Sequence, residues 1–298
     1  MSRLMSGRAG PLLALLGGAC AIAFSPIFVR LTETGPAAAG FWRLAWALPA
    51  LALLTARDAR AAPAGGWRPT PMVLLAGLFF ALDLGFWHYG IKLTSVANAT
   101  ILANLSPVFV TAGAWLVLRE RPGWGFLAGL ALALAGTWVI AAAKGGGVGL
   151  DPGLGNLLSI TTAGWYAIYM LCVRKARFSQ GAAPVMFWSS LIGAPLLLVA
   201  AVLLGERLLP TSLSGWLACI GLGVVHVAGQ GSISWALGRL PAATASVIIL
   251  IQPVIAAGLG FLIFAEPMSP LQIAGGAIAL AGVVIAQIAA ARASPNPA

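Results

Sequence analysis

Two long segments of this chain repeat each other, and this internal repeat limits the architectures open to it more than any other feature. Residues 94–140 align with residues 240–286 at a constant offset of 146 positions and without a gap. Identical pairs at this offset include the less common residue types: Pro107 with Pro253, Glu120 with Glu266, Gly129 with Gly275, and Gly136 with Gly282. An internal duplication of this kind predicts two domains of similar structure, residues 1–146 and residues 147–298.

Composition places both repeats in a membrane. Hydrophobic residues make up 60% of the chain, charged residues make up 8%, and the mean hydropathy is +0.96. A water-soluble protein needs far more charge to cover its surface. Apolar runs of roughly 20 residues recur, and each is long enough to cross a bilayer core of ~30 Å. The net charge of +10 does not predict nucleic-acid binding, because the basic residues are spread between the apolar runs.

Ten apolar stretches are candidate membrane spans. They cover residues 10–30, 36–56, 70–91, 95–118, 123–143, 154–173, 182–205, 213–237, 242–264 and 270–291. Since each repeat holds five spans, an odd number, the second repeat enters the membrane upside down relative to the first. We therefore predict an all-α membrane protein with ten transmembrane helices, arranged as two inverted five-helix repeats.

Lysine and arginine predict the orientation, because cytoplasmic loops carry an excess of both. With the N-terminus inside, twelve basic residues lie on the inner side: Arg3, Arg8, Arg57, Arg60, Arg68, Arg119, Arg121, Arg174, Lys175, Arg177, Arg239 and Arg292. Four lie on the outer side: Arg30, Lys92, Lys144 and Arg207. Both termini are therefore expected in the cytoplasm.

Both repeats contain the same arrangement of landmarks. Each has a proline in its fourth span, a glutamate before its fifth span, and then a run of small residues. These landmarks are Pro107, Glu120 and residues 128–136 in the first repeat, and Pro253, Glu266 and residues 274–282 in the second. The pattern resembles the EamA-type half of the drug/metabolite transporter superfamily, and the resemblance covers essentially the whole chain. In its tryptophan-rich composition the chain is most similar to YddG-type exporters of aromatic and other amino acids. The resemblance implies a transporter of five plus five helices, but its motifs belong to the scaffold and do not identify the cargo.

Polar residues recur on one face of the fourth span. Thr100, Asn104, Pro107 and Thr111 follow each other at helical spacing. Polar side chains are costly in lipid and therefore face other helices or a cavity, so both a cavity lining and interhelical hydrogen bonds fit this face. Pro107 and its counterpart Pro253 are expected to loosen their helices near the membrane midplane.

The eighth span carries a second polar face. His226, Gln230 and Ser234 recur at a spacing of four residues. The residue equivalent to His226 in the first repeat is Phe80, so the repeat does not explain this histidine. A substrate contact and a structural hydrogen bond are both open interpretations.

Aromatic residues gather at mid-depth in the third and sixth spans. Trp165, Tyr166 and Tyr169 lie near mid-depth in the sixth span, and Trp87 joins them from the third span. Trp165 and Tyr166 lie too deep to be interfacial anchors. Rings in a central cavity would bind apolar or aromatic groups by contact area and stacking.

One carboxylate, Asp83, falls clearly inside a span. It lies at a depth similar to that of Arg43, the one basic residue inside a span, at about 10–13 Å from the outer helix ends. An ion pair between them is the structural interpretation. The functional interpretations are proton coupling and binding of a substrate ammonium group by Asp83.

Small residues form stripes in the fifth and tenth spans, at Gly125, Gly129, Gly136, Gly275 and Gly282. Such stripes suit close helix packing, within one chain or in a dimer. Neither a metal site nor a cofactor is predicted, because Cys20, Cys172 and Cys219 lie far apart inside apolar segments. No enzyme is predicted either, because the chain has no H-E-x-x-H or G-x-S-x-G motif and no second deep carboxylate beside Asp83.

The residues and the resemblance together predict an exporter in the bacterial inner membrane. It would move amino acids, including aromatic ones, and related amphipathic metabolites by alternating access through a central cavity, as a monomer or homodimer. Candidate substrate-binding residues are Asp83, Trp87, Thr100, Asn104, Trp165, Tyr166, Tyr169, His226 and Gln230. The alternative within the superfamily is a carrier of sugar phosphates or nucleotide sugars. That cargo would need several deep basic residues, and Arg43 alone is available.

Overall fold

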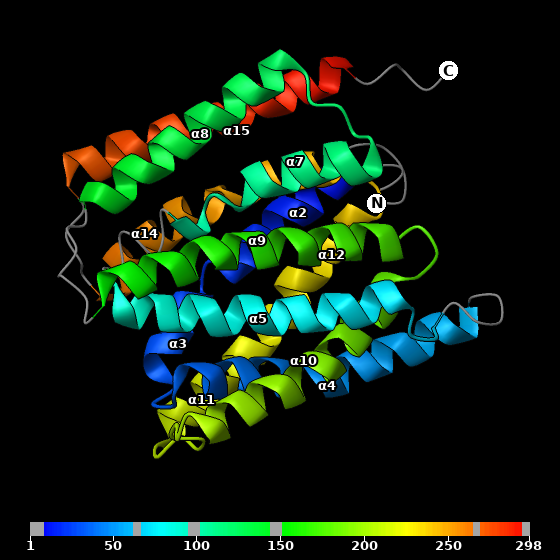
Figure 1. The fold of residues 1–298 in the computed structure, drawn as a ribbon, viewed down its shortest axis with the longest axis vertical. Coiled ribbons are helices and arrows are strands. Elements are labelled where there is room, and N and C mark those ends of the chain that lie inside the picture. The colour runs from blue at the N-terminus through cyan, green and yellow to red at the C-terminus, as the bar shows by residue number, and fades with distance from the viewer. Residues whose placement is uncertain (1–8, 62–66, 95–101, 144–150, 265–268, 294–298) are drawn as a thin grey trace.

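The computed structural model describes residues 9–61, 67–94, 102–143, 151–264 and 269–293 (Figure 1). In these ranges the regular elements are all helical. They are α2 (Ala9–Ile22), α3 (Ser25–Leu31), α4 (Pro36–Ala61), α5 (Pro71–Leu93), α7 (Ser106–Leu118), α8 (Trp124–Ala143), α9 (Pro152–Ala176), α10 (Ala182–Leu203), α11 (Leu213–Val225), the π-helix η1 (His226–Gln230), α12 (Gly231–Leu237), α13 (Ala242–Ile249), α14 (Ile251–Phe264) and α15 (Pro270–Ala293).

Most of these helices are long and apolar enough to cross a bilayer. Within the described ranges, eight helical segments meet both conditions, and two shorter apolar helices lie at Ser106–Leu118 and Trp124–Ile140. Large apolar side chains such as Leu116, Leu203 and Leu262 stay more than three-quarters exposed, as expected for a surface that faces lipid. The chain is therefore a multi-pass membrane protein, as its composition predicts.

Prolines interrupt three of the spans. Pro26 and Pro107 lie in the first turns of α3 and α7, and Pro253 lies in the first turn of α14. Proline has no backbone N–H and its ring clashes with the preceding turn, so the helix stops before it and restarts around it. The expected loosening at Pro107 and Pro253 is thus present as a turn at Asn104 and Leu105 and as a turn at Leu250.

The helices pack in pairs across the molecule. In Figure 1, α8 and α15 lie side by side along one edge, α4 and α10 lie toward the opposite edge, and α5 and α9 pass between them. The α11–η1–α12 span packs against α2, α3 and α4. This arrangement gathers α4, α5, α9, α10 and η1 around one interior region.

Small residues allow the closest of these contacts. A Cβ atom at Gly136 would overlap the backbone of Ala279, and one at Gly282 would overlap the backbone of Ala133. The glycine stripes of the fifth and tenth spans are therefore used within the chain, where they join α8 to α15.

Carboxylates outside the spans stabilise the starts of helices. Asp151 accepts a hydrogen bond from the Leu154 amide at the start of α9, at 3.0 Å. Glu206 accepts from the Ala37 and Ala38 amides in the first turn of α4, at 3.2 and 2.9 Å. A negative charge is favourable at a helix N-terminus because four amides there lack helical partners.

Candidate functional site

Eight side chains from five elements meet in the interior, and we call this group the central cluster. It consists of Arg43 from α4, Phe80 and Asp83 from α5, Tyr166 and Tyr169 from α9, Ser190 from α10, and His226 and Gln230 from η1. All are buried except Tyr166, which is half-buried. Five of its members were predicted from the sequence, and the structure adds Arg43, Phe80 and Ser190.

The ring of Phe80 connects the members of the central cluster. It stacks on Tyr169 with ring centroids 4.5 Å apart, and on His226 with centroids 5.4 Å apart. The Arg43 guanidinium carbon lies 5.7 Å from the centre of the same ring, within the range of a cation–π interaction. Tyr166 adds a fourth ring, 5.8 Å from Tyr169.

The π-helix places two polar side chains in the central cluster. His226 is 0% exposed, and its Nε2 atom lies 3.0 Å from the Ser190 hydroxyl. Gln230 lies near the Tyr166 hydroxyl and interacts with it electrostatically. His226 Nδ1 and Gln230 Oε1 are buried without a hydrogen-bond partner in the described part of the chain. π-Helical turns often occur at functional sites, because the wider turn reorients side chains.

Arg43 and Asp83 are both buried, but they are not in direct contact. They interact electrostatically, yet no hydrogen bond or salt bridge joins them in the described residues. The Nε atom of Arg43 also lacks a partner there. The direct ion pair that the sequence suggested is therefore absent from this conformation.

A second aromatic group lies beside the central cluster, between α5 and α9. Trp165 stacks on Phe79 with centroids 5.6 Å apart and meets the edge of Phe86 at 6.0 Å. Its indole N–H is buried without a partner among the described residues. Trp87 lies one turn beyond Asp83 on α5, and its ring is 5.1 Å from that of His88. The two predicted tryptophans thus lie beside the central cluster, Trp87 on α5 and Trp165 on α9 against α5.

The predicted polar face of the fourth span does not continue as one helix. A turn at Asn104 and Leu105 precedes α7, so Asn104 and Thr111 are not on one regular helical face. Asn104 instead lines a cavity of about 240 Å³ against α8, together with Leu105, Leu134, Ala135, Thr137 and Trp138. This cavity shares no lining residue with the central cluster. Thr100 lies outside the described residues.

One sequence signal could have identified the added residue Phe80. Phe80 and His226 occupy equivalent positions of the two repeats, at the offset of 146. In the structure their rings stack on each other, so equivalent positions meet here. Ser190 carries no comparable signal, because its role depends on the position of the η1 turn.

A multi-pass helical protein with a buried site of charges and aromatic rings among its spans has the architecture of a membrane transporter. The EamA-like transporter family model matches residues 9–142 and again residues 153–287. The chain belongs to this family, which is part of the drug/metabolite transporter superfamily.

Several curated relatives are named as exporters. The pseudopaline exporter CntI of Pseudomonas aeruginosa is 28% identical over 224 residues, covering 74% of this chain and 75% of that protein. A Streptantibioticus cattleyicolor protein named "Probable terminal-alkyne amino-acid exporter" is 28% identical over 287 residues, covering 89% and 88%. The aromatic amino acid exporter YddG of Ancylobacter novellus is 29% identical over 155 residues, covering 51% and 53%.

A solved crystal structure shares the fold. It superposes with a TM-score of 0.77 at 21% sequence identity, and the match covers 97% of this chain and 100% of the other.

Proposed function

We propose that this transporter exports amino acids, including aromatic ones, by alternating access through the central cluster. The observation that carries the proposal is the composition of the cluster: one cation, one anion, three aromatic rings and a buried histidine among the spans. An aromatic surface binds apolar and aromatic side chains of a substrate, and buried polar groups bind the ammonium and carboxylate groups of an amino acid. Two relatives that are named as amino acid exporters support this cargo class.

The proposal includes two inverted repeats, residues 1–146 and 147–298, each with five spans. Close contacts between α8 and α15 support it, because they occur in equivalent pairs. Gly129 approaches Ala286 while Gly275 approaches Ile140, and these pairs exchange under the offset of 146. Likewise, Gly136 approaches Ala279 while Gly282 approaches Ala133. Reciprocal contacts of this kind are typical of a two-fold pseudosymmetric pair.

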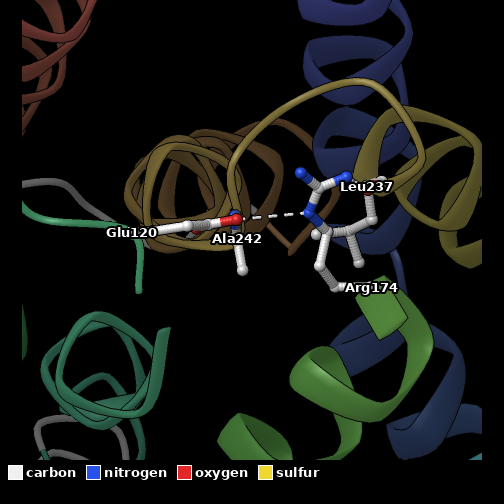
Figure 2. Close-up of polar contacts among 4 residues, drawn as sticks. All are labelled: Glu120, Arg174, Leu237 and Ala242. Carbon is white, nitrogen blue, oxygen red and sulfur yellow. Dashed lines mark hydrogen bonds and ion pairs between the residues drawn. The ribbon is translucent and has the colours of Figure 1, made fainter. Parts of the chain in front are cut away.

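Polar contacts at both ends of the bundle connect the two halves of the chain. At one end, Glu120 Oε1 accepts from Arg174 Nε at 3.3 Å, and Glu120 Oε2 accepts from the Ala242 amide at 2.9 Å (Figure 2). Arg174 also donates to the Leu237 carbonyl at 2.8 Å. At the other end, the Glu206 carboxylate accepts hydrogen bonds from the Ala37 and Ala38 amides and from the Tyr89 hydroxyl.

We call these two groups the Glu120 contact and the Glu206 contact. Each joins residues of the first half to residues of the second half, and both are closed while the central cluster is buried. In the proposed cycle one of them opens at a time, so that the cluster faces one side of the membrane and then the other. By the distribution of basic residues, the Glu120 contact faces the cytoplasm and both termini lie there.

The alternative cargo, a sugar phosphate or a nucleotide sugar, is less well supported by the central cluster. Its single arginine is accompanied by Asp83, so the two formal charges cancel. A doubly charged phosphate would meet a site of no net positive charge, and burying it there would be costly.

Transport into proteoliposomes tests the proposal. Labelled Phe, Met and Thr are offered to vesicles loaded with unlabelled amino acids, with and without a pH gradient. We expect saturable uptake of at least Phe and Met, and a loss of uptake in Tyr166→Ala without a change in folded yield. Uptake that follows the gradient would add proton coupling to the proposal. Absence of uptake for all three would contradict the cargo class while leaving the family assignment intact.

A further inference from the structure

Two buried opposite charges in the central cluster lack a direct partner. Arg43 is 5% exposed and Asp83 is 8% exposed, and no salt bridge joins them in the described part of the chain. Removing charges from water is costly, and direct contact normally offsets that cost. A buried cation and a buried anion without direct contact therefore both lack the partner that would offset this cost, and a ligand that carries both charges could supply it.

Phe80 defines where that group would lie. The Arg43 guanidinium sits over the Phe80 ring, and Asp83 is three residues further along α5, on the same face of that helix. Tyr169 of α9 stacks on the same Phe80 ring, and Tyr166 lies beside Tyr169. The two charges thus flank an aromatic surface.

Buried polar atoms without partners occur on Arg43 itself and on the η1 turn. Arg43 Nε, His226 Nδ1 and Gln230 Oε1 have no hydrogen-bond partner within the described residues. Buried polar groups in folded proteins are nearly always paired, so unpaired ones require an explanation. A polar ligand between α4, α5 and η1 would supply the missing partners.

We propose that the central cluster recognises the zwitterionic head of a free α-amino acid, with the carboxylate on Arg43 and the ammonium on Asp83. This inference rests on the proposed function and specifies which residues bind the two charged groups of the substrate. An arginine fork matches a carboxylate in two parallel hydrogen bonds, and a carboxylate accepts the ammonium donors. The substrate side chain then lies against Phe80 and the two tyrosines.

Recognition of both charges predicts strong discrimination against ligands with only one. An amine without the carboxylate leaves Arg43 unpaired, and an acid without the ammonium leaves Asp83 unpaired. A site built to pair polar groups rejects such analogues because an unpaired buried group remains.

Competition in proteoliposomes tests this recognition. Uptake of labelled Phe by the wild-type protein is competed with unlabelled Phe, phenethylamine or 3-phenylpropionate. We expect the amine and the acid to compete at least ~30-fold more weakly than Phe, because leaving one buried charge unpaired costs about 2 kcal/mol or more. Equal competition by all three compounds would overturn the inference, while saturable Phe uptake in the same assay would leave the proposed function standing.

Variants separate recognition from a structural role. Arg43→Gln is expected to remove the preference for Phe over phenethylamine. Asp83→Asn is expected to remove the preference for Phe over 3-phenylpropionate. The double variant Arg43→Gln/Asp83→Asn leaves no unpaired charge, so it should fold even where a single variant does not. Arg57→Gln is the matched control, because Arg57 is exposed on the same helix α4.

The double variant gives the decisive result. If Arg43 and Asp83 only stabilise the fold, neutralising both restores Phe uptake to the level of Arg57→Gln, and the inference is wrong. If Arg43 and Asp83 bind the two charged groups of the substrate, the double variant keeps its thermal unfolding temperature, but unlabelled Phe competes at least ~30-fold more weakly than in the wild type. A wild-type protein that moves no amino acid would remove the proposed function and this inference together.

Discussion

At the scale of single residues, the π-helical turn decides which atoms the central cluster presents. The Nε2 atom of His226 lies 3.0 Å from the Ser190 hydroxyl, while Nδ1 is buried without a partner in the described structure. The hydroxyl of Ser190 therefore orients the imidazole ring and fixes which nitrogen is left for a ligand.

Removing the Ser190 hydroxyl should destabilise the folded protein. In Ser190→Ala the buried Nε2 atom of His226 loses its partner, which we expect to lower the free energy of unfolding by about 1–3 kcal/mol. Thermal unfolding in nanodiscs measures the loss. The control is Ser189→Ala, because Ser189 is equally buried but donates only to the Met186 carbonyl of its own helix. Equal losses in the two variants would contradict an orienting role for Ser190.

At the scale of elements, glycines and carboxylates determine how helices meet and begin. The α8–α15 pair depends on glycines that let two backbones touch. The start of α11 depends on Glu33, which accepts hydrogen bonds from the amides and hydroxyls of Thr211 and Ser212. Glu33 itself adopts a left-handed conformation with φ of 58°, which places its carboxylate beside those donors.

A methyl group at the α8–α15 contact should separate the two helices. We expect Gly136→Ala to lower stability by about 1–3 kcal/mol, because the added Cβ overlaps the Ala279 backbone, which cannot move without shifting α15. Chemical unfolding in mixed micelles compares it with Gly164→Ala. A Cβ at Gly164 meets nothing within 4 Å, so that variant should be neutral or stabilised by about 0.5–1 kcal/mol. A neutral Gly136→Ala would mean that the pair tolerates a wider spacing.

The Glu33 carboxylate predicts a pH dependence of stability. Hydrogen bonds from the side chains of Thr211 and Ser212 lower the pKa of Glu33 from 4.5 to about 2. Because this pKa is lower in the folded state, the unfolded state binds more protons between these values. The stabilisation is therefore complete above pH 4.5 and is lost as the pH falls toward 2. Unfolding temperatures of the wild type and Glu33→Gln should differ at pH 7 and converge near pH 2. A difference that persists there would contradict the carboxylate as the cause.

At the scale of the whole molecule, the Glu120 contact and the Glu206 contact hold the two halves together at opposite ends. Weakening one end should favour the conformation open on that side. A charge-assisted hydrogen bond contributes about 1.5–3 kcal/mol, which corresponds to roughly tenfold or more in population. In the proposed cycle the two glutamates therefore determine which side of the membrane the central cluster faces.

Accessibility of a buried position checks this balance. In a background without native cysteines, Thr162→Cys reports on opening, because Thr162 is 4% exposed on α9. We expect Glu120→Gln to raise its labelling by an impermeant maleimide from the Glu120 side several-fold, and Glu206→Gln to raise it from the other side. An increase from the same side in both variants would contradict the assignment of the contacts to opposite gates.

Much of the architecture follows from local sequence properties. The length of the apolar runs predicts the spans, and proline chemistry predicts the breaks at Pro107 and Pro253. Small residues predict close packing, although not which helix is the partner. Tyr166 and Tyr169 were predicted from their position near mid-depth in the sixth span, and both lie in the central cluster.

Other features depend on contacts between distant segments. A periodic helix model cannot foresee the turn that separates Asn104 from Thr111, or the π-turn that aims His226 at Ser190. It also cannot tell whether Arg43 touches Asp83, because equal depth does not specify distance across the bundle. The amino-acid sequence thus shows that the chain is a helical membrane protein and predicts its spans and its internal duplication, because hydrophobicity and short-range sterics are local properties. The three-dimensional packing establishes which polar atoms remain unpaired, because that depends on how five helices are placed around Phe80.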